Sequence, residues 1–217
     1  MSDIFREVDE EVRREHYKKL WERYGKYVIA LAVVLIASVS GWRAWEWWQG
    51  RQAEAAGSTY MAAAMLSEEG KHLEAETMFG TLAKEGPRSY RILASLRAAA
   101  ELARRDPKAA AEAYDAIAGD TSIGTDFRDL ARLRAGYLLA DTASYEELRQ
   151  RIEPLTAADR PFRHSARALL ALSAWRGGDV AAVRRWSDLI VADPETPGSI
   201  RLHSEVLLSL LAADGKS

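Results

Sequence analysis

The chain has 217 residues, no cysteine and a formal net charge of −2. The absence of cysteine excludes disulfides, thiol chemistry and thiolate metal sites. No part of the chain is basic enough to suggest a nucleic-acid partner. Alanine, leucine, arginine and glutamate dominate, and β-branched residues are scarce outside one segment. This composition predicts an all-α protein.

Residues 3–24 are highly charged, but apolar side chains recur among them at helical spacing. Ile4, Val8 and Val12 are four residues apart, which predicts an amphipathic helix. Two interpretations remain open for it. The helix docks a cytoplasmic partner, or it is a solvated helix that its lysines and arginines hold near the lipid headgroups.

Residues 27–42 contain no charge over sixteen positions and predict a transmembrane helix. The run is shorter than the roughly 20 residues that a span needs, but Lys26 and Arg43 flank it and can extend their charges to the headgroups. Aromatic residues form a belt at each end, with four tryptophans between positions 42 and 48. We expect an anchor at 27–48 with a Trp-rich outer belt, its apolar surface including Tyr27, Leu31, Val34, Leu35 and Trp42.

Two other interpretations of this run are a buried core helix and a cleaved signal peptide. A core helix does not need charged, Trp-rich flanks. The preceding 26 residues are longer and more acidic than the basic region of a signal peptide. An uncleaved anchor is therefore the favoured prediction. Ala37 and Gly41 are four residues apart, so they either form a helix-packing face or contact lipid.

The distribution of positive charge predicts the orientation of the anchor. Seven lysines and arginines precede the run, and two stand in the eighteen residues after it. Because positive charge is retained on the cytoplasmic side, we expect residues 1–26 to be a cytoplasmic arm. Residues 49–217 then lie outside the membrane, which is the periplasm if the protein is bacterial.

Turn signals divide residues 49–217 into nine predicted helices in antiparallel pairs. Three helix starts have capping residues: Asp106 before Pro107, Ser144 with Glu147, and Asp179 after two glycines. Residues 199–213 are predicted to form a last helix that caps the stack.

The helix pairs repeat along the chain. An alanine and an aromatic residue recur four apart, at Ala75 and Phe79, Ala110 and Tyr114, and Ala182 and Trp186, and the larger aliphatics Leu148 and Ile152 stand where the third such pair is expected. The larger members are 35, 38 and 34 residues apart. Sixteen residues before them lie Ala63, Ala98, Gly136 and Leu170. The pattern resembles the tetratricopeptide repeat, a 34-residue helix pair that stacks into a solenoid. An irregular helical bundle is the alternative, because the Trp and Tyr typical of the first helix are missing.

No motif for catalysis, metal binding or cofactor binding is visible. The four histidines, His16, His72, His164 and His203, have no ligand spacing and are predicted to be surface or helix-end residues. We expect no enzyme activity, no cofactor and no small-molecule substrate. A solenoid instead presents a concave groove to protein segments. Its candidate lining, unless these are ordinary surface residues, is Tyr60, Tyr90, Arg97, Arg128, Arg132 and Arg167.

Nearly the whole chain resembles the YfgM-like family of ancillary SecYEG translocon subunits. The resemblance rests on the segment Leu20-Trp21-Glu22-Arg23-Tyr24-Gly25-Lys26-Tyr27, the anchor that follows with its Trp cluster, and Gly70-Lys71-His72-Leu73-Glu74-Ala75. It implies a single-pass protein of the bacterial inner membrane with its repeats in the periplasm. Its partners would be the Sec translocon and a periplasmic chaperone or a nascent chain.

The function predicted first is therefore that of a membrane-anchored adaptor beside the Sec translocon. An envelope-assembly or division scaffold is a second hypothesis. A third is a regulator that acts through the cytoplasmic arm.

Overall fold

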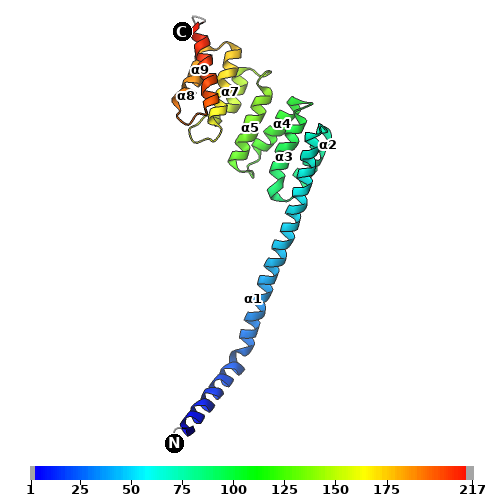
Figure 1. Cartoon of the computed structure of the whole chain (residues 1–217), viewed down its shortest axis with the longest axis vertical. Coiled ribbons are helices and arrows are strands. Elements are labelled where there is room, and N and C mark those ends of the chain that lie inside the picture. Colours follow the sequence, from blue (N-terminus) through cyan, green and yellow to red (C-terminus); the bar gives the residue numbers. More distant parts are fainter. Residues whose placement is uncertain (1–2, 214–217) are drawn as a thin grey trace. The chain divides into compact units, whose positions relative to one another are not determined.

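The computed structural model describes residues 3–213, with side chains described at Lys18 and from Trp21 to Ala213. Every regular element in this range is a helix, which confirms the predicted fold class (Figure 1). In chain order the helices are α1 (Asp3–Glu68), α2 (His72–Glu85), α3 (Arg88–Leu102), α4 (Pro107–Gly119), α5 (Thr125–Leu139), α6 (Tyr145–Ile152), the 3₁₀ turn η1 (Glu153–Leu155), α7 (Arg163–Gly177), α8 (Val180–Ala192) and α9 (Gly198–Ala213).

Helix α1 contains three segments that were predicted separately: the arm, the anchor and the first repeat helix. The chain divides into two compact units, Met1–Glu54 and Ala55–Ser217. Residues 55–68 of α1 therefore belong to the repeat domain. The domain boundaries predicted at residues 26 and 48 remain predictions. The side chains of Ile4, Val8 and Val12 in the arm are not among those that the structure describes.

The repeat domain is built from four helix pairs and a last helix. The first pair is residues 55–68 of α1 with α2, which share a hydrophobic cluster. The others are α3 with α4, α5 with α6, and α7 with α8, and α9 follows them and packs on α8 and α7. Short turns join the helices, and α2 to α9 follow one another along the domain in Figure 1. Each pair also contacts the first helix of the next pair. This is the nearest-neighbour packing of a solenoid.

The core consists of three hydrophobic clusters, each shared by neighbouring helices. The first is formed by Ala56, Ala63, Ala75, Phe79, Leu82 and Ala94, from α1, α2 and α3. The second is formed by Ala99, Ala111, Tyr114, Ile117, Ala118, Ala131 and Ala135, from α3, α4 and α5. The third centres on Leu148, Ile152, Leu170 and Trp186 and reaches Leu211 of α9. Each larger residue of the repeated pattern is therefore buried in a cluster that joins one repeat to the next.

Small residues stand where helices approach closely, as the repeat pattern predicted. Gly136 of α5 is the clearest case. A Cβ atom at this position would lie 2.6 Å from Cδ1 of Ile152 and 3.0 Å from Cδ2 of Leu169. Ala63 and Ala75 are also fully buried. Ala98 is partly buried against the first cluster. In the fourth pair Leu170 is fully buried instead, in the larger third cluster.

The three predicted helix caps are present. Asp106 accepts a hydrogen bond from the Ala109 amide at 2.9 Å, with Pro107 in the first turn. Ser144 and Glu147 form a reciprocal capping box. Before α8, Gly178 has a φ of 75°, a left-handed conformation that favours glycine, and Asp179 accepts from the Ala182 amide at 3.0 Å.

The last helix buries one face and exposes apolar residues on another. Ser204 and Leu211 are buried, and Leu207 packs on the third cluster. Leu202, Val206 and Leu210, each four residues after the last, are exposed. Helix α9 therefore covers the end of the core as predicted, but its outer face is not polar.

Candidate functional site

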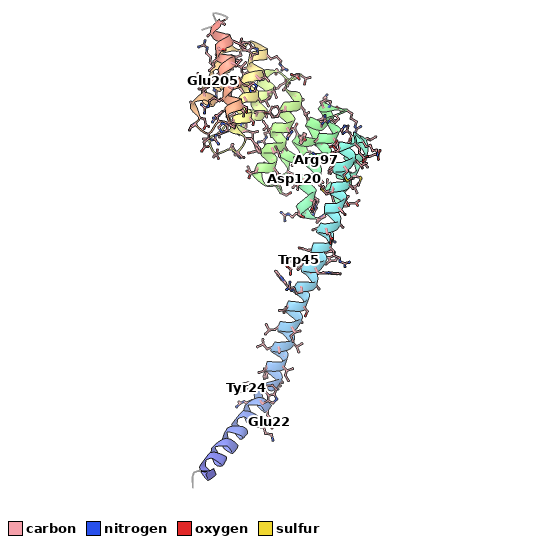
Figure 2. The ribbon with its side chains drawn as sticks, in the orientation of Figure 1. Glu22, Tyr24, Trp45, Arg97, Asp120 and Glu205 are labelled. Atoms are coloured by element: carbon pink, nitrogen blue, oxygen red, sulfur yellow. The ribbon has the colours of Figure 1, made fainter. Side chains whose placement is uncertain are left out.

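A groove of about 420 Å³ lies along the first helices of the first three repeats. Helix α3 and the turn after it supply most of its lining, and residues 93, 96, 97, 100, 101 and 104 follow the spacing of one helical face. The lining comprises Tyr60 and Ser67 of α1, Leu93, Leu96, Arg97, Ala100 and Glu101 of α3, Arg104 of the turn after α3, Tyr114 of α4, and Leu130 and Arg134 of α5. Figure 2 labels Arg97 among these side chains.

Aromatic rings fix one end of this groove. The rings of Tyr60 and Phe79 meet edge to face, with centroids 5.1 Å apart, and Tyr60 lies 6.0 Å from Tyr90. The Arg97 guanidinium stacks over Phe79, 5.5 Å from its ring centroid. The stacking holds the cation in place through attraction to the ring face. Nε of Arg97 is buried and has no hydrogen-bond partner among the described residues.

Glu101 is a buried carboxylate that joins the first two repeats. Ser67 donates a hydrogen bond to its Oε1 at 2.7 Å, and Nδ1 of His72 donates to Oε2 at 2.8 Å. Burial alone raises the pKa of Glu101, but the two hydrogen bonds and the nearby Arg97 outweigh it, so the pKa lies below its usual range. Glu101 is thus an ionised residue whose two oxygens are already occupied.

Tyr114 closes the groove from α4. Its hydroxyl donates to the Leu96 carbonyl at 3.2 Å. Burial raises the pKa of this phenol, so it stays protonated and remains a donor. The hydroxyl therefore secures α4 to α3 and is not free for a ligand.

Three guanidinium groups remain available in the groove. Among the described residues, Arg97, Arg104 and Arg134 form no ion pair within 4.0 Å, whereas other arginines of the domain do. With Glu101 as the one carboxylate of the lining, the groove has an excess of positive charge. Leu93 is 40% exposed and adds apolar surface to the same lining.

The six residues predicted to line the groove do not all lie in it. Tyr60 and Arg97 line the groove, and Tyr90 packs beside it. Arg128 donates from Nε to the Ala118 carbonyl at 3.1 Å. Arg132 lies 3.9 Å from Asp129, outside the groove lining.

Arg167 is an interior residue, although it was predicted to line the groove. It is only 7% exposed. Its guanidinium donates to the carbonyl oxygens of Thr156 and Leu189 and to Asp193 at 3.1 Å. These contacts use its donors to hold the end of α8, so a partner segment cannot reach it.

Nine of the eleven lining residues were not predicted to line a groove: Ser67, Leu93, Leu96, Ala100, Glu101, Arg104, Tyr114, Leu130 and Arg134. Those on α3 repeat at three- and four-residue intervals. The signal was therefore present, but the groove face of α3 became evident only from its packing against α1 and α5.

A second hollow, of about 740 Å³, lies between the α3–α4 turn, the end of α5 and α6. Most of its charged side chains are already engaged. Arg105 pairs with Glu76 at 2.8 Å, and Arg151 pairs with Asp115. Asp106 and Glu147 cap helices. It offers fewer free polar groups than the groove and is the weaker candidate.

A cluster of charges ties the α8–α9 loop to α7. Asp193 accepts from Arg163 at 2.9 Å and from Arg167. The Arg163 bond, with further bonds from Arg167 and the Glu195 amide, holds the pKa of Asp193 well below its usual range. His164, predicted as a surface or helix-end residue, is near the start of α7 but buried, and burial lowers its pKa. Its Nδ1 lies 3.0 Å from the Thr196 hydroxyl.

The helix from Trp21 to Glu68 contains the candidate membrane span, by length and composition. The predicted anchor residues Tyr27, Leu31, Val34, Leu35 and Trp42 are between 58% and 66% exposed. Figure 2 shows Tyr24 and Trp45 standing out from this helix. A Cβ on Gly41 would meet nothing within 4 Å. A large exposed apolar surface of this kind needs a bilayer or a partner to cover it.

Charged residues accompany the aromatic belts of this helix. Lys26 lies over Tyr27, 5.2 Å from the ring centroid, and Arg51 lies over Trp47 at 4.5 Å. Trp42 and Trp45 contact each other with centroids 5.9 Å apart. Such pairs of an amphipathic ring and a cation are typical of membrane–water interfaces.

Comparison with known proteins identifies one family. The model of the tetratricopeptide repeat-like domain matches residues 18–167. No curated protein and no solved structure gives a significant match. Domains of this kind are typically non-catalytic modules that bind other proteins, and no enzyme family is indicated. The matched region covers more than half of the chain, which therefore belongs to the tetratricopeptide repeat-like domain family.

Proposed function

We propose that the protein is a membrane-anchored adaptor beside the Sec translocon. Its repeat domain, on the periplasmic side of a bacterial inner membrane, binds a chaperone or an emerging secreted chain. The observation that carries the proposal is the groove on α1, α3 and α5, whose lining holds an exposed leucine and guanidinium groups that form no ion pair with described residues, in a protein-binding fold. The apolar run with its aromatic belts supports the anchor.

Anchoring strengthens the proposal because it raises the effective concentration of the domain beside other membrane proteins. Two weak contacts made by tethered molecules can give high overall occupancy. The excess of lysine and arginine before the run supports the orientation. The resemblance of the segment from Leu20 to Tyr27 to ancillary translocon subunits supports the choice of the Sec translocon.

In-membrane photocrosslinking tests the partner. A photoreactive amino acid replaces Leu93 in the groove, and a matched one replaces the exposed Ala116 on α4, outside the groove lining. Mass spectrometry should identify Sec channel components and periplasmic chaperones from position 93 but not from position 116. If neither class is found, the proposal is wrong. Cell-wall or division proteins in their place would support the scaffold hypothesis.

The absence of cysteine permits a direct test of orientation. Single cysteines replace the exposed Lys18 and Leu73. A membrane-impermeant maleimide should label position 73 in intact spheroplasts, and position 18 only after the membrane is permeabilised. The reverse labelling pattern would contradict the periplasmic placement of the repeats.

A further inference from the structure

We propose that the groove selects an acidic segment of a partner protein, in which several carboxylate side chains alternate with apolar ones. This inference rests on the proposed function, since it takes the groove as the partner-binding surface. It goes further in naming the chemistry of the segment that binds there.

The first argument is charge. Arg97, Arg104 and Arg134 form no ion pairs with described residues, and the carboxylate of the lining, Glu101, already accepts from Ser67 and His72. The groove is therefore electropositive, although the whole chain has a net charge of −2. A guanidinium binds a carboxylate through parallel hydrogen bonds that are stronger than those between neutral groups. An acidic segment is the complementary partner.

The second argument is the number and placement of the guanidinium groups. Arg97 lies on α3, and Arg104 lies in the turn that follows α3. Arg134 comes from a different helix, α5. A single carboxylate has two oxygens, so it cannot form paired hydrogen bonds with three guanidinium groups at once. The arrangement calls for acidic side chains at several positions of one segment, rather than for a single C-terminal carboxylate.

The third argument is the apolar surface that shares the lining with the charges. Leu93 is exposed, and Leu96 and Leu130 are partly buried in the same lining. Burying such side chains against apolar groups of a partner stabilises the complex by removing them from water. A uniformly charged segment would leave this surface uncovered, so the matching segment also contains apolar residues.

The Arg97 guanidinium is already ordered before a partner arrives. It stacks on Phe79, whose ring also contacts Tyr60. A side chain held in place loses less conformational entropy when it binds. We therefore expect Arg97 to contribute at least as much to affinity as Arg104, which is exposed.

The test uses the full chain in micelles of an uncharged detergent and fluorescent peptides as probes. One peptide alternates acidic residues with leucine and has an amidated C-terminus. A second replaces each acidic residue by its amide counterpart. Fluorescence anisotropy should show that the acidic peptide binds and that salt weakens its binding, whereas the amide peptide binds at least tenfold more weakly, as expected from loss of charge-assisted hydrogen bonds (about tenfold each).

Substitutions locate the binding to the groove. Arg97→Gln and Arg134→Gln should each weaken binding of the acidic peptide about tenfold. Arg91→Gln is the matched control, because Arg91 is exposed on α3 but outside the groove lining. Arg97→Gln removes the contact with Phe79 and could perturb folding, which circular dichroism would detect. In that case the binding measured for Arg134→Gln tests the inference.

Three results would overturn the inference: equal binding of the acidic and amide peptides, unchanged binding by the Arg134→Gln variant, or binding only when the C-terminal carboxylate is free. Crosslinking from position 93 in membranes distinguishes a failure of the acidic-segment inference from a failure of the proposed adaptor function. If Sec and chaperone crosslinks persist in the Arg97→Gln and Arg134→Gln variants, the adaptor function stands and the acidic-segment inference fails.

Discussion

Replacing Gly136 by alanine tests whether the close crossing of α5 and α6 in the third repeat limits the size of the side chain at this position. Alanine in a helix interior is more stable than glycine by about 1 kcal/mol. At this position, however, the new methyl would lie 2.6 Å from Cδ1 of Ile152 and 3.0 Å from Leu169. Both neighbours are buried in the third cluster, and overpacking of this kind costs about 1–3 kcal/mol. The net change in unfolding free energy should therefore lie between about zero and a loss of 2 kcal/mol.

Gly80 in α2 is the matched control. A Cβ there meets nothing within 4 Å, so Gly80→Ala should stabilise the domain by about 1 kcal/mol. Urea unfolding of the full chain in detergent micelles, followed by circular dichroism, measures both variants. The difference between them isolates the cost of the crossing.

A double variant identifies the atom responsible. Ile152→Val removes Cδ1, the atom nearest to the new methyl. Gly136→Ala combined with Ile152→Val should therefore be more stable than the sum of the two single changes. The reasoning is refuted if Gly136→Ala stabilises as much as Gly80→Ala, or if the two changes are simply additive.

Three further predictions concern the helix cap, the charge cluster and the anchor. Ser144→Ala removes the capping box of α6 and should lower the unfolding free energy by about 1 kcal/mol, measured by urea titration; an unchanged midpoint would contradict it. Because the pKa of Asp193 is lowered in the fold, its contribution to stability is complete above the unfolded pKa, near 4, and is lost as the pH falls below that value. Asp193→Asn, which weakens the bond to Arg163, should therefore show a smaller loss of thermal stability between pH 6 and about pH 3 than the unmodified protein. Val34→Arg places a charge within the apolar run at a cost of about 3 kcal/mol and should increase the fraction that alkaline carbonate extracts from membranes, whereas Gln49→Arg, beyond the run, should not.

Local features of the fold were predictable because their causes lie close together in the sequence. Capping by Asp106, Ser144 and Asp179 depends on residues within three positions. The recurrence of small and large residues predicted which side chains are buried, from Phe79 to Trp186. The repeat itself therefore followed from spacing alone.

The groove was predicted less well because its position depends on packing between repeats. Arg97 and Arg167 both stand on first helices of pairs, and nothing near them in the sequence separates their environments. Arg97 stacks on Phe79 at the groove, whereas Arg167 meets carbonyl oxygens from η1's end and from α8. Those acceptors come from segments 11 and 22 residues away. Only the tertiary structure brings them together.

The hydrogen bonds to Glu101 also determine how the first repeat comes apart. In a linear array each repeat is stabilised only by its neighbours, so a terminal repeat tends to fray before the rest. Ser67 and His72 belong to the first repeat, and Glu101 belongs to the second. Fraying would leave this ionised carboxylate without both donors, so the two repeats should open as one cooperative unit. Arg104 lies three residues after Glu101, in the turn that follows α3, and belongs to the same lining. A segment bound in the groove would therefore also restrain that opening, and partner binding would suppress fraying without a change of shape.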